Sequence, residues 1–191
     1  MDGPETLKAM GRTGFLDRSP LTRDALEFAA SRHDGQTRDG NGVPFVTHPM
    51  EVACLLHEAG YSDEVVAAGV LHDVLEETDA QGDDLKRRFG DEVARLVEAV
   101  SDDPSIEDYA QRKSALRDQV ERSGDCAAAV FAADKVSKAR ELGERRGRFS
   151  RHDKLRIDHY EASLEMLERA LPGRGLVDRL RAEVDALHSL P

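Results

Sequence analysis

A run of nine residues, Leu71–Asp79 (LHDVLEETD), places four ionisable side chains in an apolar stretch of helical character, VVAAGVLHDVLEE. Side chains four residues apart share one face of a helix, so His72 is expected beside Glu76. By the same rule Asp73 is expected beside Glu77. Burying such a cluster is costly unless a cation offsets its charge. The stretch therefore predicts a metal site whose other ligands come from elsewhere in the chain.

The rest of the chain is also patterned for helices. Apolar residues recur at helical spacing in segments that begin at polar caps or prolines and end at glycine, and no segment shows convincing strand alternation. Thr22 is the expected cap of the first helix. The sequence predicts an all-α, single-domain helical bundle over residues 21–191, after a loosely ordered lead-in over 1–20. The expected helices cover about 23–33, 48–59, 65–77, 83–89, 91–103, 106–123, 126–146, 151–170 and 174–188.

The composition argues against several classes of partner. The 191 residues carry 38 acidic and 27 basic side chains, a formal net charge of −11 that repels nucleic acid polymers. No apolar stretch reaches the roughly 18 residues of a membrane span, and the first residues lack the apolar block of a signal peptide. Cys54 and Cys126 are too few for a disulfide framework or a zinc–thiolate site. We expect a protein of the reducing cytoplasm, without a membrane partner, and the pattern leaves its oligomeric state open.

A polar segment separates His33 from His48. Its sequence, DGQTRDGNGVPFVT, is too rich in Gly, Asn and Asp for a helix. It predicts an irregular or hairpin-like loop. A polar loop next to a histidine is a candidate rim for a substrate pocket.

Two imidazoles and two carboxylates form the candidate ligand set. Each lies within or at the end of an apolar helical stretch: His33, His72, Asp73 and Asp134. This mixture of nitrogen and oxygen ligands suits Mn²⁺, Fe²⁺ or Zn²⁺, with coordination positions left for water. Such a cation lowers the pKa of bound water from about 15.7 towards about 7 in favourable cases. Glu76 and Glu77 are placed to orient that water or to accept its proton.

The order of these residues resembles a known family. The pattern H…HD…D, set in FAASRHDGQ, PFVTHP, AAGVLHDVLEETD, FGDEVARLVEAVSDD and AADKVSKARE, is similar to the HD-domain metal-dependent phosphohydrolases. Within them it looks like the hydrolase domain of the RelA/SpoT proteins and the stand-alone small alarmone hydrolases. The resemblance covers roughly residues 20–170. It implies an all-α bundle that holds one Mn²⁺ and removes the 3′-pyrophosphate of (p)ppGpp, a small phosphorylated nucleotide, to leave GDP or GTP.

The resemblance also implies a role for each matching residue. The metal ligands would be His33, His72, Asp73 and Asp134. The family's Glu-Asp pair, which handles the nucleophilic water, falls on Glu76 and Glu77, with one carboxylate longer by a methylene. The candidate substrate contacts are Arg23, Arg38, His48, Lys138, Arg140, Lys154 and Tyr160.

Two further departures from the family bear on the substrate. Lys138 replaces the Asn of the family's ADxxxNxR segment, and Phe45 replaces a Tyr. A lysine cannot accept a hydrogen bond, but it can pair with a phosphate. Three functions therefore stay open: a (p)ppGpp 3′-pyrophosphohydrolase, a phosphohydrolase of another nucleotide such as the 2′-phosphate of NADPH, and a non-catalytic nucleotide-binding module.

Each assignment also has a simpler structural interpretation. His48 can be a core histidine, and Glu76 with Glu77 can be a solvated helix end. The charges around Arg140 can form an exposed, salt-bridged helix face. These alternatives make different predictions about burial and partners.

Overall fold

A computed structural model of the protein describes residues 14, 19–38, 42–145 and 149–189. Within these residues the secondary structure is helical, and the only β-type pairing is an isolated antiparallel bridge between Thr37 and Pro44. The all-α prediction is confirmed. The expected lead-in over residues 1–20 lies almost entirely outside the described residues. The chain divides into two compact units, residues 1–98 and 99–191, and the expected single domain over 21–191 stays a prediction.

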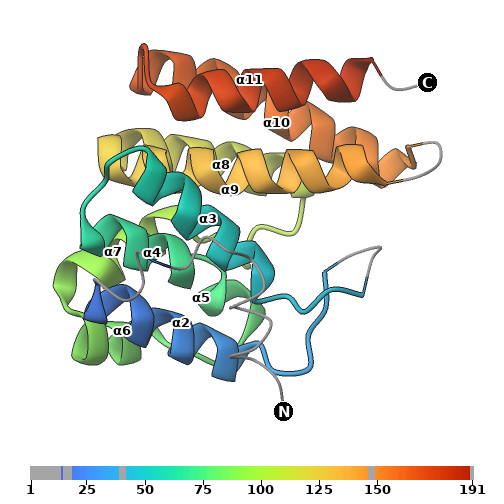
Figure 1. The fold of residues 1–191 in the computed structure, drawn as a ribbon. Helices are drawn as coiled ribbons and strands as arrows, with labels where there is room; N and C mark the ends of the chain where they lie inside the picture. The colour runs from blue at the N-terminus through green and yellow to red at the C-terminus, as the bar shows by residue number, and fades with distance from the viewer. Residues whose placement is uncertain (1–13, 15–18, 39–41, 146–148, 190–191) are drawn as a thin grey trace. The chain divides into compact units, whose positions relative to one another are not determined.

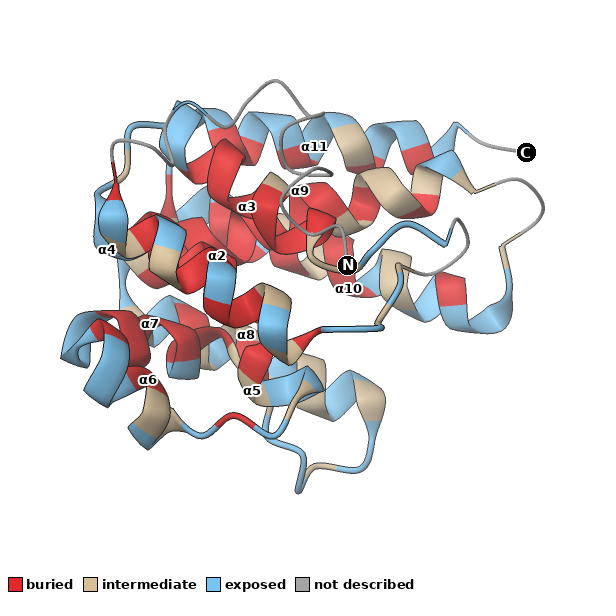
Figure 2. Cartoon of the chain, turned by 60° about the horizontal axis from the view of Figure 1, so that its bottom comes forward, coloured by how far each residue is buried: buried red, intermediate tan, exposed pale blue. Residues whose placement is uncertain are grey.

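The first unit is built around a helix, α4, that is buried from Val65 to Leu71. The other helices described in this unit are α2 (Pro20–Arg32), α3 (Thr47–Glu58), α5 (Val74–Glu77), α6 (Gly82–Phe89) and α7 (Asp91–Val100), the last of which runs across the boundary between the units. Helix α4 (Asp63–Leu71) packs against both α2 and α3 (Figure 1). All of its side chains from Val65 to Leu71 are buried (Figure 2). A helix that is apolar all round belongs inside a core, which explains the continuous run VVAAGVL.

Gly69 allows α3 and α4 to approach closely. A Cβ atom added at Gly69 would lie 2.4 Å from Leu56 Cδ1 and 3.3 Å from Val52 Cγ1, both on α3. His48 precedes Val52 by one helical turn, and His72 follows Gly69 by three residues. The close packing of the two helices therefore sets the separation of these two imidazoles.

The helix predicted over 65–77 is interrupted at His72 and Asp73. Helix α4 ends at Leu71, and the four-residue helix α5 begins at Val74. The His72 imidazole Nδ1 lies 2.8 Å from the carbonyl oxygen of Gly69, an oxygen that a continuous helix would offer to the backbone N–H of Asp73. This competition between side chain and backbone for one carbonyl accounts for the break. The prediction that one continuous helix carries the whole motif, and so aligns residues four apart on one face, is therefore wrong.

Near α2, the cap of the helix differs from the prediction, whereas the loop that follows agrees with it. Ser19, not Thr22, caps α2, because the Ser19 hydroxyl accepts a hydrogen bond from the backbone N–H of Thr22 at 3.2 Å. The segment after His33 is hairpin-like as predicted. Arg38 N–H donates to Val43 O at 2.8 Å, and the N–H of Phe45 donates to Gln36 O at 3.0 Å.

The second unit is organised around α9 (Asp125–Glu144). This helix packs against the other three helices of the unit, α8 (Tyr109–Ser123), α10 (Arg151–Ala170) and α11 (Gly175–His188). Every side chain from Ala127 to Ser137 is buried, including Asp134. The many alanines of α9 let its neighbours approach on several sides. None of the described helices combines the length and the apolar content that crossing a bilayer requires.

Candidate metal centre

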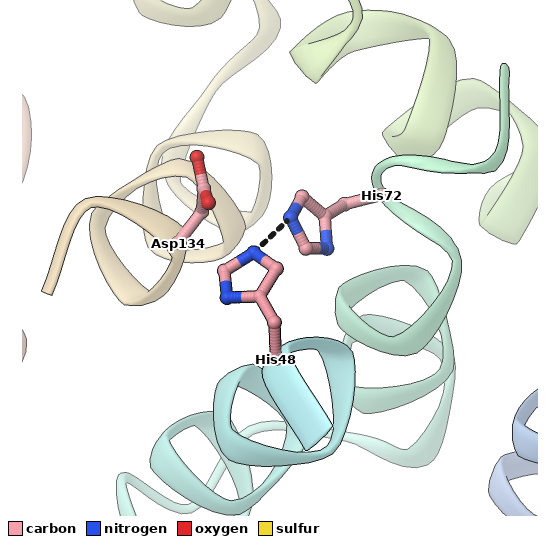
Figure 3. A group of neighbouring side chains, drawn as sticks. All are labelled: His48, His72 and Asp134. Carbon is pink, nitrogen blue, oxygen red and sulfur yellow. Dashed lines mark hydrogen bonds between the residues drawn. The ribbon is translucent and has the colours of Figure 1, made fainter. Parts of the chain in front are cut away.

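Three side chains of the first unit converge where α4 ends. The His48 and His72 Nε2 atoms are 3.1 Å apart (Figure 3). Asp73 Oδ2 lies 3.0 Å from His72 Nε2 and 3.3 Å from His48 Nε2. His48 comes from the first turn of α3, whereas His72 and Asp73 form the break between α4 and α5. All three side chains are buried.

The spacing of these three atoms fits a cation. Two ligand atoms at right angles around an octahedral cation, each about 2.1 Å from it, are about 3.0 Å apart. The separations of 3.0, 3.1 and 3.3 Å therefore match one face of a coordination octahedron. A mixture of imidazole and carboxylate ligands is suited to transition-metal cations such as Mn²⁺, Fe²⁺ and Zn²⁺.

The protonation of His72 gives an independent argument for a cation. A carbonyl oxygen only accepts, so the 2.8 Å contact with Gly69 O places a proton on His72 Nδ1. In its neutral form this imidazole presents a lone pair at Nε2, directed at the Asp73 carboxylate oxygen 3.0 Å away. Two lone pairs at this distance repel unless a cation or a second proton lies between them. Metal-binding histidines commonly use such a backbone acceptor to fix the ligating nitrogen.

His33 is a second buried imidazole whose Nδ1 has a hydrogen-bond acceptor. It caps the C-terminus of α2 and is 3% exposed. Its Nδ1 lies 2.8 Å from Gln36 Oε1, and its buried Nε2 has no hydrogen-bond partner among the described residues. Burial lowers the pKa of His33, an effect that the hydrogen bond to Gln36 and the charge of Asp73 only partly oppose. His33 is therefore a neutral imidazole with a lone pair at Nε2.

The structure brings the His48 imidazole, rather than that of the predicted ligand His33, into contact with His72 and Asp73, and the ligand set itself stays a prediction. His48 Nε2 lies in contact with both His72 and Asp73. His33 adjoins this cluster through Phe45, whose ring centroid lies 4.6 Å from that of His33 and 5.8 Å from that of His48. The sequence had assigned His48 to the substrate. The His-Pro pair at the start of a helix was the available signal for its role in the cluster.

The two glutamates that follow the motif are exposed. Glu76 and Glu77 both lie on α5. The backbone N–H groups of Glu76 and Glu77 lie 3.2 and 2.9 Å from the carbonyl oxygen of Asp73, so this carbonyl accepts the first hydrogen bonds of the short helix. Their carboxylates are thus attached within one turn of a residue of the cluster.

Asp134, also labelled in Figure 3, comes from α9 of the second unit. Two cations lie against its carboxylate: the ammonium of Lys135, and the ammonium of Lys138 at 3.1 Å from Oδ1. The Lys135 ammonium also lies 4.4 Å from the centroid of the Phe131 ring. These two ammonium groups offset the negative charge of the buried carboxylate.

The substrate candidates of the first unit differ in their surroundings. Arg23 is exposed on α2. Arg38, in the hairpin-like loop, pairs with Glu51 at 3.3 Å, and both side chains are largely buried. The loop is therefore fastened to α3, close to His48.

The candidates of the second unit include two residues with internal partners. Arg140 pairs with Glu183 at 2.8 Å, which fits the salt-bridged interpretation of this part of α9. The buried Tyr160 hydroxyl accepts a hydrogen bond from Arg156 Nε at 3.3 Å. Lys154 is exposed on α10.

Comparison with known proteins identifies the family of this chain. The sequence profile of the HD domain matches residues 25–152. Human guanosine-3′,5′-bis(diphosphate) 3′-pyrophosphohydrolase MESH1 is 42% identical over 122 residues, which cover 62% of this chain and 68% of MESH1. The bifunctional (p)ppGpp synthase/hydrolase SpoT of Escherichia coli K12 is 45% identical over 85 residues, 44% of this chain and 12% of SpoT.

Solved structures show the same relationship. A metazoan ortholog of SpoT, described as hydrolysing ppGpp, superimposes with a TM-score of 0.75 at 27% identity, over 89% of this chain and 97% of its own. A Listeria monocytogenes protein superimposes with a TM-score of 0.67 at 29% identity, over 75% of this chain and 99% of its own.

The chain therefore belongs to the HD-domain family. Members of this family that hydrolyse phosphate esters depend on divalent metals, and the buried His/Asp cluster of this chain is a candidate for such a metal. Within the family it is a relative of MESH1 and of the hydrolase domain of SpoT, which confirms the resemblance seen in the sequence.

Proposed function

We propose that this protein is a metal-dependent (p)ppGpp 3′-pyrophosphohydrolase. The observation that carries the proposal is the buried triangle of His48 Nε2, His72 Nε2 and Asp73 Oδ2 in a chain 42% identical to human MESH1, which is named for this activity. Water adds to the phosphorus bonded to the ribose 3′-oxygen, the bond between this phosphorus and the 3′-oxygen breaks, and the 3′-oxygen takes up a proton. The products are pyrophosphate and GDP or GTP.

Three residues of the first unit would hold the cation: His48, His72 and Asp73. We place His48 in this set because its Nε2 contacts both other ligands. The family pattern H…HD…D supplies the fourth ligand, Asp134, as a prediction from the sequence. Mn²⁺ is the ion that we propose, since it accepts imidazole and carboxylate together and retains positions for water. When bound, such a cation supplies a water of lowered pKa.

The chain's own groups orient the ligands and move the proton. The carbonyl of Gly69 holds His72 with its Nε2 lone pair directed at the cluster. Glu76 and Glu77 are the carboxylates that orient the attacking water and accept its proton, because they follow Asp73 within one turn and their exposed position lets them pass the proton on to solvent.

Lys138 supports a second candidate substrate. It stands where the family has an Asn, and its ammonium is one of the two that lie against the Asp134 carboxylate. A lysine recognises phosphate as a point charge and does not supply the acceptor that an amide offers to a base. NADPH, with its 2′-phosphate, is therefore the competing substrate.

One experiment separates these functions. The purified chain is stripped with a chelator, reloaded with Mn²⁺, and incubated with ppGpp, NADPH and GTP while pyrophosphate and phosphate are measured separately. Pyrophosphate released from ppGpp only in the presence of metal is the expected result. Phosphate released from NADPH without turnover of ppGpp would establish the second candidate. Tight metal binding with no turnover of any substrate would contradict an enzymatic role.

A further inference from the structure

Gln36, three residues after His33 in the polar loop, connects the end of α2 with the segment that carries the two glutamates. We infer that Gln36 is a positioning residue of the metal centre: it fixes the tautomer of His33 and fastens that imidazole to the backbone of Glu77. The inference rests on the proposed function for the identity of the site. It concerns a residue to which the family pattern assigns no role.

The Gln36 amide makes two hydrogen bonds of opposite sense. Its Oε1 lies 2.8 Å from His33 Nδ1, and its Nε2 donates to Glu77 O at 3.0 Å. Rotating the amide by half a turn would place a donor against Nδ1 and an acceptor against a carbonyl oxygen. The bond to Glu77 therefore determines which amide atom faces His33.

The backbone of Gln36 is fixed as well. Its N–H donates to His33 O at 3.0 Å, and its carbonyl accepts from the N–H of Phe45 at 3.0 Å. The Phe45 ring lies against the His33 ring, with centroids 4.6 Å apart. The backbone of Gln36 is thus held in place, so its side chain loses little further conformational freedom when it makes its two hydrogen bonds.

His33 is then held as the Nδ1–H tautomer. Because Gln36 Oε1 only accepts, Nδ1 carries the proton and Nε2 carries the lone pair. This Nε2 is buried and has no hydrogen-bond partner in the described parts of the chain. Leaving an acceptor buried and unsatisfied costs free energy. The site recovers this cost when a water or a substrate hydroxyl enters and donates to His33 Nε2.

The bond to Glu77 has a second consequence. It ties the start of the polar loop to α5. Beside it, Arg32 at the end of α2 forms an ion pair at 2.7 Å with Asp79, two residues after α5. The imidazole of His33 and the backbone of α5 are therefore linked through the Gln36 side chain. Removing Gln36 releases the tautomer and this connection together.

Two substitutions separate these effects. Gln36→Met has a similar length and removes both hydrogen bonds. Gln36→Glu retains an acceptor for His33 Nδ1 and loses the donor to Glu77 O. Gln119→Leu is the control, because Gln119 also donates to two backbone carbonyls, of Ala99 and Ser101, but far along the chain from His33.

The tautomer is measured directly by ¹⁵N NMR of the histidine side chains. The full chain is loaded with Zn²⁺, which is diamagnetic and accepts imidazole ligands, and His33→Asn identifies the His33 signals. We expect Nδ1 of His33 to be protonated in the wild type, in Gln36→Glu and in Gln119→Leu, and the Nε2–H form to appear in Gln36→Met. An unchanged His33 tautomer in Gln36→Met would overturn the inference. So would loss of the Nδ1 proton in Gln36→Glu, which covers the case in which Gln36→Met does not fold.

A double-mutant cycle gives the second readout. Gln36→Met should lower kcat for ppGpp by about 10- to 100-fold, the usual cost of losing a residue that orients a metal-site group. In the His33→Asn background the same substitution should have much less effect, since Gln36 acts through His33. An undiminished effect in that background would contradict the inference. A wild type that binds metal but does not turn over ppGpp would refute the proposed function, and the NMR result would still decide the role of Gln36.

Discussion

Replacing Gly69 with alanine tests whether the close approach of α3 and α4 sets the metal centre. The added Cβ would lie 2.4 Å from Leu56 Cδ1, far inside the ordinary contact of about 3.5–4.0 Å between carbons. Leu56 is fully buried, so it has no free space into which to move. Overpacking of this kind costs about 1–3 kcal/mol. Alanine also gains about 1 kcal/mol of helix propensity over glycine, which masks part of the cost.

Gly143→Ala is the matched control that removes this masking. Gly143 lies inside α9, and a Cβ atom there would meet Leu187 Cδ2 at 3.5 Å, an ordinary contact. Both variants gain the same helix propensity, so the difference between them isolates the packing cost. That difference of about 1–3 kcal/mol corresponds to roughly 2–12 °C in Tm for a chain of this size.

The assay is thermal unfolding of both metal-free variants by circular dichroism, followed by titration with Mn²⁺. Gly69→Ala should unfold at the lower temperature. It should also bind Mn²⁺ more weakly than Gly143→Ala, because the methyl group pushes the helix of His48 away from that of His72. Equal unfolding temperatures would refute the packing argument. A lower Tm with unchanged Mn²⁺ affinity would refute the link between helix spacing and the metal centre.

Three further outcomes are expected. Asp73→Ala should lose the bound metal, measured by elemental analysis, whereas Glu76→Gln should keep it and lose kcat; unchanged turnover in Glu76→Gln would remove that residue from the mechanism. Lys138→Asn should tighten Mn²⁺ binding in a calorimetric titration, because it removes an ammonium 3.1 Å from Asp134 Oδ1, and it should raise the preference for ppGpp over NADPH; weaker binding would contradict this reasoning. Burial lowers the pKa of His159, so the folded chain keeps this imidazole neutral. The unfolded chain takes up a proton on it below about pH 6.5. The free energy of unfolding therefore falls as the pH drops below this value, by up to about 1.4 kcal/mol per pH unit. His159→Gln should lose less stability than the wild type in urea unfolding between pH 7 and 5, and identical slopes would argue against a buried neutral His159.

The helices could be predicted because local signals determine them. Gly90, with φ +90°, separates α6 from α7 where the sequence placed the boundary. The break after Leu71 could not be predicted in this way. It depends on a hydrogen bond from the His72 side chain to Gly69 O, and the apolar periodicity continues through it.

The ligand set was harder to predict than the fold. His33 and His48 both stand next to the polar loop, and composition does not tell which imidazole reaches Asp73. The path of the loop decides this, through the pairing of Arg38 with Val43 and the contact of Arg38 with Glu51. Gln36 was missed because its role depends on an amide that joins two segments 41 residues apart in sequence.

The His72 and His33 imidazoles differ in how easily a mutation can change their tautomer. The proton on His72 Nδ1 is held by a backbone carbonyl, which every amino acid possesses, so no substitution at Gly69 deletes that acceptor. The proton on His33 is held by a side chain, and a single codon change at Gln36 removes it. Laboratory evolution of this enzyme towards another phosphorylated nucleotide should therefore find its adjustable position at Gln36, while the orientation of His72 persists through the same mutations.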